Sequence, residues 1–515
     1  MHNQIEIMDT TLRDGEQTDG VSFSAFEKLQ IARYLLEELV VDRIEIASAR
    51  VSEGERDSVR EVFQWAAESQ NAGRIEVLGF TDHRASVNWI QDCGGSVLNL
   101  LTKGSRRHCT EQLGKTLSEH LHDIARTMDY AADRKMRVNV YLEDWSNGFL
   151  NSPDYVRELV GELRKLPLNR LLLPDTLGIM DPEEVRAGIN DLLQLHPELI
   201  IDFHAHNDYG LATANCLAAV RAGAAGVHVA VNGLGERAGN APLESVITAL
   251  HDKLHVRTNI NERAIVGASR LVETFSGKRV QSNRPIVGQD VYTQTAGIHA
   301  DGDRKNNLYA NPILPERFGR QRVYALGKLA GKASIKNNLK ALGIQLSEER
   351  EVLLLERIKS LGEQKKTITV DDLPFLIEDL FGSRVLQTEI RITDAVVTTN
   401  LHGRPQARIA LEFKGQKLEA QAEGDGGYDA FMNALLELAG KLGLKLPTLR
   451  DYEVRIPPGG KTDALVEAVI IWELPDGTTL RTVGVSPDQV LAAIRATEKM
   501  LNRVLQHSGL QAATR

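Results

Sequence analysis

The sequence predicts a TIM (β/α)8 barrel, followed by small, mostly helical linker subdomains and a C-terminal α+β domain. Three observations lead to this prediction. The first half of the chain alternates short β-branched runs with amphipathic stretches of helical length, eight times over. The C-terminal part contains an internal repeat. The chain has 515 residues, which at roughly 150 residues per domain indicates more than one hydrophobic core.

The eight β-branched runs end in polar residues, and the segments between them carry apolar residues three and four positions apart. Ser or Asp at the start of such segments is a typical helix cap. The runs begin near Ile5, Arg43, Ile75, Val97, Val138, Arg170, Ile200 and Gly226. Eight such units in about 250 residues is the count of a TIM barrel. An open doubly wound sheet is the alternative, but it usually has fewer strands and a Gly-rich phosphate turn, where this chain reads DTTLRDGEQ.

Composition divides the rest of the chain. We expect the barrel over residues 1–281. Residues 282–331 are rich in Asn, Gly, Pro and Arg, and we expect an ordered linker subdomain there that contributes to the active site. Residues 332–384 return to helical periodicity, which predicts a small helical subdomain.

The repeat lies in the last part of the chain, residues 385–515. The stretches ARIALEFKGQKLEAQAEGDGGYDAFMNALLELAGKL and EAVIIWELPDGTTLRTVGVSPDQVLAAIRATEKML each read as strand, tight turn, strand, Gly-containing loop and helix. KG and PDG supply the hairpin turns, and Asp425, or Ser486 with Asp488, can start the helices. Two such ββα units are expected to pack pseudo-symmetrically into one compact domain.

Charge and composition exclude several classes of protein. The net charge is -9, and no block of Lys or Arg could follow a phosphate backbone, so we expect no nucleic-acid partner. The sequence shows neither an export signal nor a stretch of ~20 apolar residues, so we expect a cytoplasmic protein without a membrane partner. Cys93, Cys109 and Cys216 are odd in number and far apart, which indicates buried free thiols.

Polar residues gather at the expected carboxyl ends of the strands, where a barrel holds its reactants. His204 and His206 point to the same face of the seventh strand because strand side chains alternate. Asp14 ends the first run, and Asn240 follows the eighth, which lies beside the seventh once the barrel closes. These four residues offer two nitrogens and two oxygens for Mn²⁺, Zn²⁺, Co²⁺ or Mg²⁺. The simpler alternative is a pair of capping or core histidines.

Two further charged residues are expected near this site. A turn after the first strand can bring Arg13 to the mouth, where its permanent charge can stabilise the oxyanion formed when a ketone is attacked. Asn139, Tyr141 and Glu143 alternate inward on the fifth strand. A carboxylate at Glu143 can orient substrate or transfer a proton, or it can form a salt bridge that closes the barrel end.

Two glycine-containing motifs do not indicate nucleotide sites. GLGERAG places its last glycine one residue too far for a dinucleotide fingerprint. PPGGKT has the Gly-Lys-Thr of a P-loop, but Arg455 stands where the first glycine belongs.

Four motifs, DTTLRDGEQ, HAHND, GLGERAGN and GIHADG, resemble those of the α-isopropylmalate synthase and homocitrate synthase family. The resemblance runs over essentially the whole chain. It implies an acyltransferase that joins acetyl-CoA, as co-substrate, to a small 2-oxo acid with the help of a divalent metal ion. It also implies a homodimer or higher homo-oligomer, because linker residues of one subunit would reach the barrel of another.

The resemblance assigns roles residue by residue. The metal ligands would be Asp14, His204, His206 and Asn240. Arg13 and Thr176 would hold the 2-oxo acid, with Arg13 polarising its ketone, and Glu143 would be an active-site carboxylate. The proton-transfer residues from the linker would be His299, Asp301 and Tyr309.

Substrate choice depends on the pocket beside the ketone. By strand parity Leu78, Leu101 and Tyr141 face inward and would shrink the space for the tail of the oxo acid. YLEDWSNG also departs from the pattern of isopropylmalate synthases, so the chain resembles the bacterial (R)-citramalate synthases of the family most. This resemblance implies pyruvate as substrate and a place in isoleucine biosynthesis. A 2-isopropylmalate synthase that uses 2-oxoisovalerate is the alternative; a retro-Claisen lyase and a non-catalytic amino-acid sensor are more remote.

In the family, the C-terminal domain dimerises and binds the amino acid that the pathway makes. We therefore expect inhibition by isoleucine, or by leucine under the alternative function. Candidate effector contacts mix apolar and polar groups at the ends of the repeat's elements: Tyr428, Asp429, Leu449, Tyr452, Ile456, Val466, Pro487 and Gln489. Purely structural roles remain open for the apolar ones.

Overall fold

A computed structural model describes residues 4–295, 302, 308, 311–341, 344–363, 368, 370–381, 389–455, 466–475 and 479–513. The chain divides into two compact units. The first comprises Met1–Thr293 and Ala310–Arg322, and the second comprises Gln294–Tyr309 and Val323–Arg515. Among the described residues, no helix combines the length and the apolar character needed to cross a membrane.

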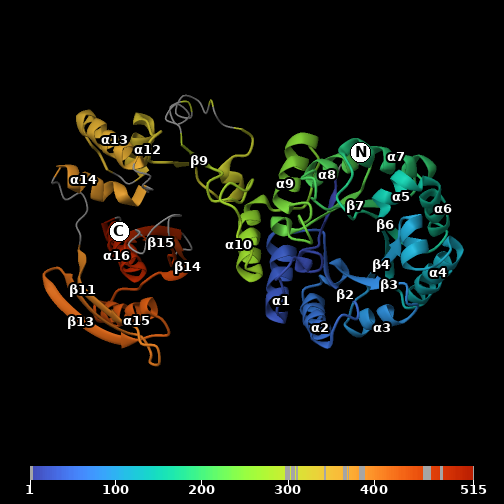
Figure 1. The fold of residues 1–515 in the computed structure, drawn as a ribbon, viewed down its shortest axis with the longest axis horizontal. Helices are drawn as coiled ribbons and strands as arrows, with labels where there is room; N and C mark the ends of the chain where they lie inside the picture. The colour runs from blue at the N-terminus through green and yellow to red at the C-terminus, as the bar shows by residue number, and fades with distance from the viewer. Residues whose placement is uncertain are drawn as a thin grey trace. The chain divides into compact units, whose positions relative to one another are not determined.

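The first unit is a closed barrel of eight parallel strands in sequence order, which confirms the predicted fold (Figure 1). Its strands are β1 (Glu6–Asp9), β2 (Arg43–Ser48), β3 (Ile75–Phe80), β4 (Val97–Lys103), β5 (Arg137–Glu143), β6 (Leu168–Asp175), β7 (Ile201–Ala205) and β8 (Gly226–Val229). β1 pairs with β8, which closes the barrel. Parallel neighbours place all eight carboxyl ends at one rim, and the site is built there.

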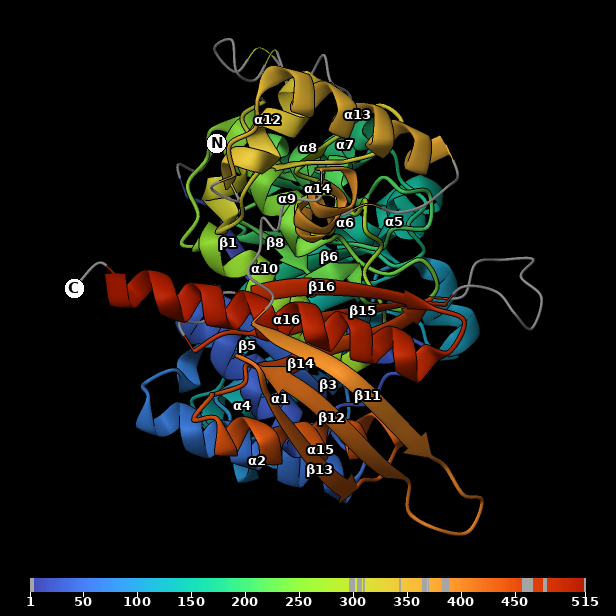
Figure 2. The same cartoon turned by 90° about the vertical axis from the view of Figure 1, so that its left-hand side faces the viewer.

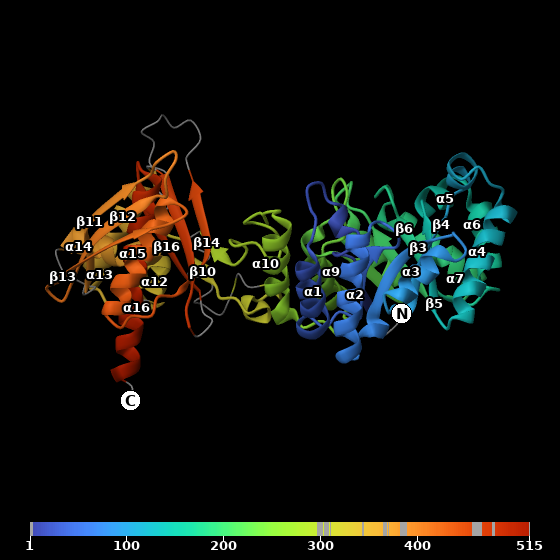
Figure 3. The ribbon, with the colours of Figure 1, turned by 90° about the horizontal axis from the view of Figure 1, so that it is seen from below.

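Helices cover the outside of the strands (Figure 1, Figure 3). They are α1 (Ala25–Arg33), α2 (Glu53–Glu68), α3 (Ala85–Asp92), α4 (Leu117–Asp133), α5 (Trp145–Asn151), α6 (Pro153–Leu163), α7 (Pro182–Leu195), α8 (Ala212–Ala222), α9 (Leu243–Ala249) and α10 (Ile265–Ser276). Ser24 and Asp181 start α1 and α7 with complete capping boxes, as predicted, and Thr116 does the same for α4. Ser152 precedes α6 but its side chain makes no cap hydrogen bond. The predicted thiols Cys93, Cys109 and Cys216 are free and buried.

The inside of the barrel is polar toward the amino ends of the strands. Arg43 forms ion pairs there with Asp202 and with Glu76, the latter at 3.0 Å between Nη1 and Oε1. Arg170 adds a second cation, 2.9 Å from Asp202 Oδ1. Because each carboxylate meets a guanidinium, the charges inside the barrel are compensated despite their burial.

The segment Ala310–Arg322 is attached to the barrel through Arg317, in the short helix η8 (Pro315–Phe318). Arg317 pairs with Asp252 at 2.9 Å and with Glu262 at 2.7 Å. Burial alone raises the pKa of Glu262, but hydrogen bonds from His251 and Arg317 outweigh it and lower the pKa to about 2. The ionised form of Glu262 therefore helps to hold this segment in place.

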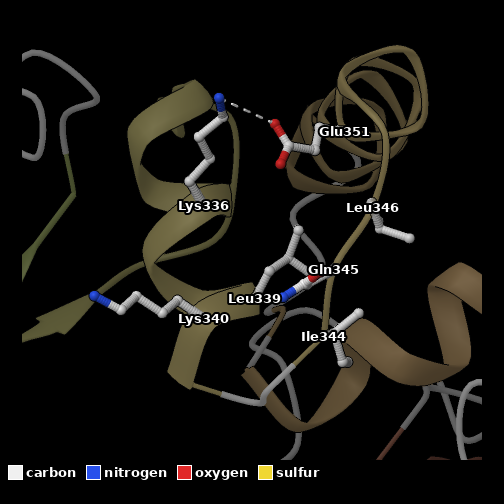
Figure 4. Close-up of a pocket in the computed structure, with 7 residues that line it drawn as sticks. All are labelled: Lys336, Leu339, Lys340, Ile344, Gln345, Leu346 and Glu351. Atoms are coloured by element: carbon white, nitrogen blue, oxygen red, sulfur yellow. Dashed lines mark ion pairs between the residues drawn. The ribbon is translucent and has the colours of Figure 1, made fainter.

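β9 (Thr293–Gln294) spans the boundary between the units and pairs with β10 (Val323–Tyr324) in a two-stranded sheet. The helices α12 (Lys332–Ala341), α13 (Glu348–Glu363) and α14 (Leu373–Phe381) follow in the second unit. Leu354, Ile358 and Leu373 lie in their common core. A shallow hollow between α12 and α13 has Lys336 on one side and Glu351 on the other, 3.6 Å apart (Figure 4). Lys340 is the third charged residue that lines the hollow.

The C-terminal part confirms the duplicated plan, with one more strand before each repeat than the sequence predicts. Its elements are β11 (Ile390–Thr398), β12 (Gln406–Phe413), β13 (Gln416–Glu423), α15 (Gly427–Lys441), β14 (Thr448–Arg455), β15 (Val466–Glu473), β16 (Thr479–Ser486) and α16 (Gln489–Ala513). Each half is an antiparallel three-stranded sheet with a helix packed on it, as the long helix α16 shows beside β15 and β16 (Figure 2).

Turn and cap chemistry follows the sequence with one correction. Lys414 and Gly415 both have positive φ and form the turn between β12 and β13. Asp488 caps α16 by accepting the N–H groups of Val490 and Leu491, as predicted. Asp425 does not cap α15, because Gly426 is the N-cap residue of this helix. The Asp425 N–H instead donates to the side chain of Asp429 in the first turn.

Candidate active site

The turn after β1 presents Arg13 and Asp14 together at the rim. β1 ends at Asp9, so Asp14 does not end the strand as the sequence analysis assumed. The N–H groups of Asp14 and Gly15 both donate to the carbonyl of Thr10, at 2.8 and 3.0 Å, and this tight turn removes strand alternation. Two consecutive side chains can therefore face the same space, and Arg13 Nη1 lies 2.5 Å from Asp14 Oδ2.

The loop after β8 brings Asn240 beside the end of β7, where it forms an isolated bridge with His206. Glycine is required at two points of this loop. A Cβ on Gly239, whose φ is +84°, would lie 2.0 Å from the carbonyl oxygen of Gly233, and one on Gly235 would lie 2.3 Å from Asn240 Nδ2. The position of Asn240 beside His206 thus depends on glycine at positions 235 and 239.

Asp14, His204 and His206 form a group that can hold a metal ion. One ligand atom from each lies within 4.8 Å of the others, and all three residues are buried. The Nδ1 atoms of both histidines and Oδ1 of Asn240 are buried without a hydrogen-bond partner, although buried polar atoms are normally paired. Unpaired nitrogens and an amide oxygen beside a carboxylate are the donors that a divalent cation would satisfy.

The charge states at this cluster suit metal binding. Burial alone raises the pKa of Asp14, but the Arg13 guanidinium outweighs it and holds the pKa well below its ordinary value. Burial lowers the pKa of both His204 and His206. Asp14 is therefore a carboxylate, and the imidazoles keep the lone pairs that a ligand needs.

Asn240 holds Asp14 in place. Its Nδ2 donates to Asp14 Oδ1 at 3.0 Å and to the carbonyl of Leu234 at 2.9 Å. Both amide hydrogens are used in this way, and Oδ1 is buried without a hydrogen-bond partner.

Glu45 is the partner of Arg13 that sequence reasoning missed. Its Oε2 lies 2.5 Å from Arg13 Nη2, and its side chain is fully buried at the middle of β2. Burial lowers the pKa of Arg13, but the charges of Glu45 and Asp14 raise it by more than burial lowers it. The guanidinium therefore keeps its charge. An acid inside the apolar run RIEIAS was the signal that could have revealed this residue.

Glu143 also has a partner that the sequence did not indicate. Lys103, at the end of β4, forms an ion pair with it, and only 8% of Lys103 is exposed. The backbone of Lys103 is fixed by His120 Nε2, which accepts its N–H at 3.0 Å. The predicted salt bridge of Glu143 is therefore present. Its carboxylate also lies at the mouth of the barrel, since β5 ends at this residue, and the predicted role in orienting substrate or transferring a proton stays a prediction.

The three residues predicted to line the substrate pocket lie in one apolar cluster inside the barrel. Leu78 and Tyr141 are buried there with Met8, and Leu101 packs against them. Arg13 Nη2 is 3.4 Å from the Tyr141 hydroxyl, so the cluster borders the guanidinium.

Thr176 follows β6 at the same rim. Its Oγ1 accepts the N–H of Asp144 at 2.9 Å, which leaves its own hydroxyl hydrogen available to donate. Arg237 donates to the carbonyl of Thr176 at 2.8 Å and pairs with Asp208 at 2.9 Å. Arg237 thereby ties together the loops after β6, β7 and β8.

Four predicted residues, His299, Asp301, Tyr309 and Ile456, lie outside the described residues. Among the other effector candidates, Tyr428 and Tyr452 meet with ring centroids 5.0 Å apart. The Tyr428 hydroxyl is 2.7 Å from Thr497 Oγ1, between the two repeats. Asp429 is engaged by the Asp425 N–H at 2.9 Å.

The remaining effector candidates lie on the second repeat. Val466 is buried at the start of β15, opposite Ser486, while Leu449 on β14 is 39% exposed. Gln489 begins α16, and Pro487 lies two positions before it. Tyr428 and Tyr452 are thus the pair of candidates with a direct contact in the described structure.

Three residues that can hold a cation, with Arg13 beside them, lie at the carboxyl rim of a closed eight-stranded barrel, where (β/α)8-barrel enzymes carry their active sites. Comparison with known proteins assigns its family. Residues 4–272 match the HMGL-like family, and the chain belongs to that family. Residues 286–366 match the homocitrate synthase post-HMGL domain-like family, and residues 367–505 match the LeuA allosteric (dimerisation) domain.

Full-length relatives carry two names. The (R)-citramalate synthase of Methanocaldococcus jannaschii is 33% identical over 97% of this chain and 99% of its own length. The 2-isopropylmalate synthase of the same organism is 32% identical over 98% of this chain and 95% of its own length. The resemblance seen in the four sequence motifs is thereby confirmed at the level of the family.

Proposed function

We propose that this chain condenses acetyl-CoA with pyruvate and releases (R)-citramalate and CoA. The observation that carries this proposal is the convergence of Asp14, His204 and His206 beside Arg13, next to the pocket residues Leu78, Leu101 and Tyr141. The relatives named as citramalate synthases support the reaction. We further propose that residues 1–281 are the catalytic domain, 282–331 and 332–384 the linker subdomains, and 385–515 the regulatory domain.

A divalent cation, Mn²⁺, Zn²⁺, Co²⁺ or Mg²⁺, held by Asp14, His204, His206 and Asn240 would draw electron density from the ketone of the oxo acid. Arg13 adds a permanent positive charge at the oxygen on which negative charge develops. Its guanidinium is fixed from two sides by Asp14 and Glu45, so it needs no reorganisation during the reaction.

Thr176 and Glu143 serve the two ends of the reactants. The free hydroxyl hydrogen of Thr176 can donate to the carboxylate of the 2-oxo acid. Glu143, paired with Lys103, is an acceptor at the mouth and can orient the acetyl group or receive a proton. His299, Asp301 and Tyr309 complete the proton transfers in this proposal, from the linker of a partner subunit.

The reaction balances in four steps. A base removes a methyl proton from acetyl-CoA, the resulting carbanion forms a C–C bond with the ketone carbon, and the alkoxide takes up a proton. Water then cleaves the thioester and releases the CoA thiol. Hydrolysis of the thioester makes the sum of these steps irreversible.

The pocket favours pyruvate over longer oxo acids in this proposal, because three large side chains border the space beside Arg13. Leu101 is the one of them that is less than fully buried. Each methyl difference in an apolar pocket is worth only ~1 to 3 kcal/mol, so some turnover of 2-oxobutyrate is expected. The relative named 2-isopropylmalate synthase supports a second candidate, in which 2-oxoisovalerate is the substrate and leucine the inhibitor.

We propose that isoleucine inhibits the enzyme by binding to the C-terminal domain of a homodimer. The match of residues 367–505 to an allosteric dimerisation domain supports this assignment. Tyr428 and Tyr452, which meet near Thr497 of the other repeat, are its central candidates. An effector that binds there would change turnover through a coupling free energy between two sites.

Release of the CoA thiol, measured with a thiol reagent, tests the function. Pyruvate should give the fastest release, EDTA should abolish it, and added Mn²⁺ should restore it. Fastest release with 2-oxoisovalerate would favour the second candidate, and no release with any 2-oxo acid would leave a non-catalytic sensor.

A second experiment tests regulation. Isoleucine and leucine are titrated against the full chain and against a chain that ends before residue 385. Isoleucine should inhibit the full chain and not the shortened chain. Equal inhibition of both chains by isoleucine would contradict the proposed effector site.

A further inference from the structure

His228 is a buried titratable residue that the proposed mechanism does not use. It lies on β8, in register with His204 on β7 and with Met8 on β1. Its side chain is fully buried inside the barrel. A polar ring in such a place normally has a defined partner on each nitrogen.

The imidazole of His228 lies between Tyr141 and Asp202. Its Nδ1 is 3.1 Å from the Tyr141 hydroxyl, and its Nε2 is 3.5 Å from Asp202 Oδ2. Asp202 also binds Arg43 and Arg170. His228 therefore connects the charged layer at the amino ends of the strands with the residues around the substrate pocket.

The Nδ1 contact is a hydrogen bond, whereas Nε2 has no hydrogen-bond partner and meets Asp202 as a charged neighbour. Ion pairs with Arg43 and Arg170 hold Asp202 as a carboxylate. An anion beside Nε2 favours the proton on that nitrogen and leaves the Nδ1 lone pair as an acceptor. The Tyr141 hydroxyl has two acceptors within reach, His228 Nδ1 at 3.1 Å and Glu45 Oε2 at 3.4 Å, and Nδ1 is the nearer of them.

The hydrogen bond between the Tyr141 hydroxyl and His228 fixes the position of the Tyr141 ring. The Tyr141 ring contacts those of His228 and His204 edge-on, with centroids 5.6 and 6.2 Å apart. The same ring packs with Leu78 and Leu101 in the pocket cluster. A shift of the ring would therefore change the space available to the tail of the oxo acid.

We propose that His228 is a specificity-determining positioning residue, which holds the Tyr141 ring where it closes the 2-oxo acid pocket against longer acyl chains. This inference rests on the proposed function. It assigns His228 no contact with substrate, since it acts through the Tyr141 hydroxyl.

Two amide substitutions separate the hydrogen bond of His228 with Tyr141 from its contact with Asp202. The shorter side chain of His228→Asn places its oxygen near the position of Nδ1 and keeps an acceptor for Tyr141. The longer side chain of His228→Gln places its amide near the position of Nε2, so it keeps a donor for Asp202 and loses that acceptor. Both variants retain a polar group in the barrel.

The measurement is kcat/KM for pyruvate, 2-oxobutyrate and 2-oxoisovalerate, in metal-loaded full-length enzyme. In the His228→Gln enzyme, the loss of one buried hydrogen bond should raise the ratio of kcat/KM for 2-oxobutyrate to that for pyruvate by about three- to tenfold. The His228→Asn enzyme should keep the ratio of the unmodified enzyme. Tyr141→Phe removes the hydroxyl and should shift the ratio as His228→Gln does, and combining the two should add nothing.

Thermal midpoints separate this role from a structural one, because loss of stability alone lowers turnover of all three acids equally. An unchanged ratio in both His228→Gln and Tyr141→Phe would overturn the inference, and so would equal shifts in the Asn and Gln variants. If His228→Gln does not fold, Tyr141→Phe decides in the same way. Failure of the unmodified enzyme to release CoA with any 2-oxo acid would instead overturn the proposed function.

Discussion

Replacing Glu45 by Gln should disable Arg13 without removing any residue that touches substrate. Glu45 Oε2 lies 2.5 Å from Arg13 Nη2, and Glu45 Oε1 accepts from Asn99 Nδ2 at 2.7 Å. Both carboxylate oxygens thus face donors. A glutamine presents one oxygen and one NH₂ group, so one of the two neighbours must meet another donor.

The magnitude follows from burial. Removing one member of a buried ion pair costs about 3 to 5 kcal/mol, and we expect the lower end because Asp14 still neutralises Arg13. Arg13 then turns to Asp14 alone and draws that carboxylate away from the cation site. Loss of a preorganised charge at the developing oxyanion should lower kcat by about 100- to 1,000-fold. CoA release as a function of Mn²⁺ concentration should also show weaker metal binding.

Glu76→Gln is the matched control. Glu76 is in register with Glu45 on the neighbouring strand, is buried, and pairs with Arg43 at 3.0 Å rather than with Arg13. Both variants should lower the thermal midpoint, whereas kcat should fall in Glu45→Gln alone. Equal losses of activity in the two variants would refute the claim that Glu45 acts through Arg13.

Three further changes are expected to act at separate points. Leu101→Ala should raise turnover of 2-oxoisovalerate relative to pyruvate by about tenfold, measured as the ratio of kcat/KM, because it opens the pocket; a constant ratio would remove Leu101 from the pocket. Lys103→Met should lower kcat by about tenfold, because Glu143 loses the cation that orients it, and it should add little to Glu143→Gln if the two act as a pair. Since the pKa of Glu262 is lowered to about 2, its contribution is present above its ordinary value of 4.5 and is lost as pH falls from 4.5 through about 2. Limited proteolysis at residues 311–322 should therefore increase over that range, and the Arg317→Met chain should be cleaved there already at neutral pH; cleavage that does not depend on pH or on Arg317 would contradict this attachment.

Local pattern was enough to predict the elements of the barrel. RIEIAS corresponds to β2 (Arg43–Ser48), and the other seven runs also fall on strands. β-branched alternation and helix caps are properties of neighbouring residues, so they are legible in one sequence. The same local logic failed for β11 and β14. Both strands precede the stretches that the repeat covers, and β14 reads TLRDYEVR, in which polar residues obscure the alternation.

The sequence by itself determined the eightfold order of strands and helices, the duplicated C-terminal plan, and the residues that can bind a metal. Tertiary structure alone decided which charges meet. Glu45 reaches Arg13 across 32 positions, Lys103 reaches Glu143 across 40, and His228 reaches Tyr141 across 87. The closing of the barrel brings these pairs together, and no periodicity within a strand records a partner that lies on another strand.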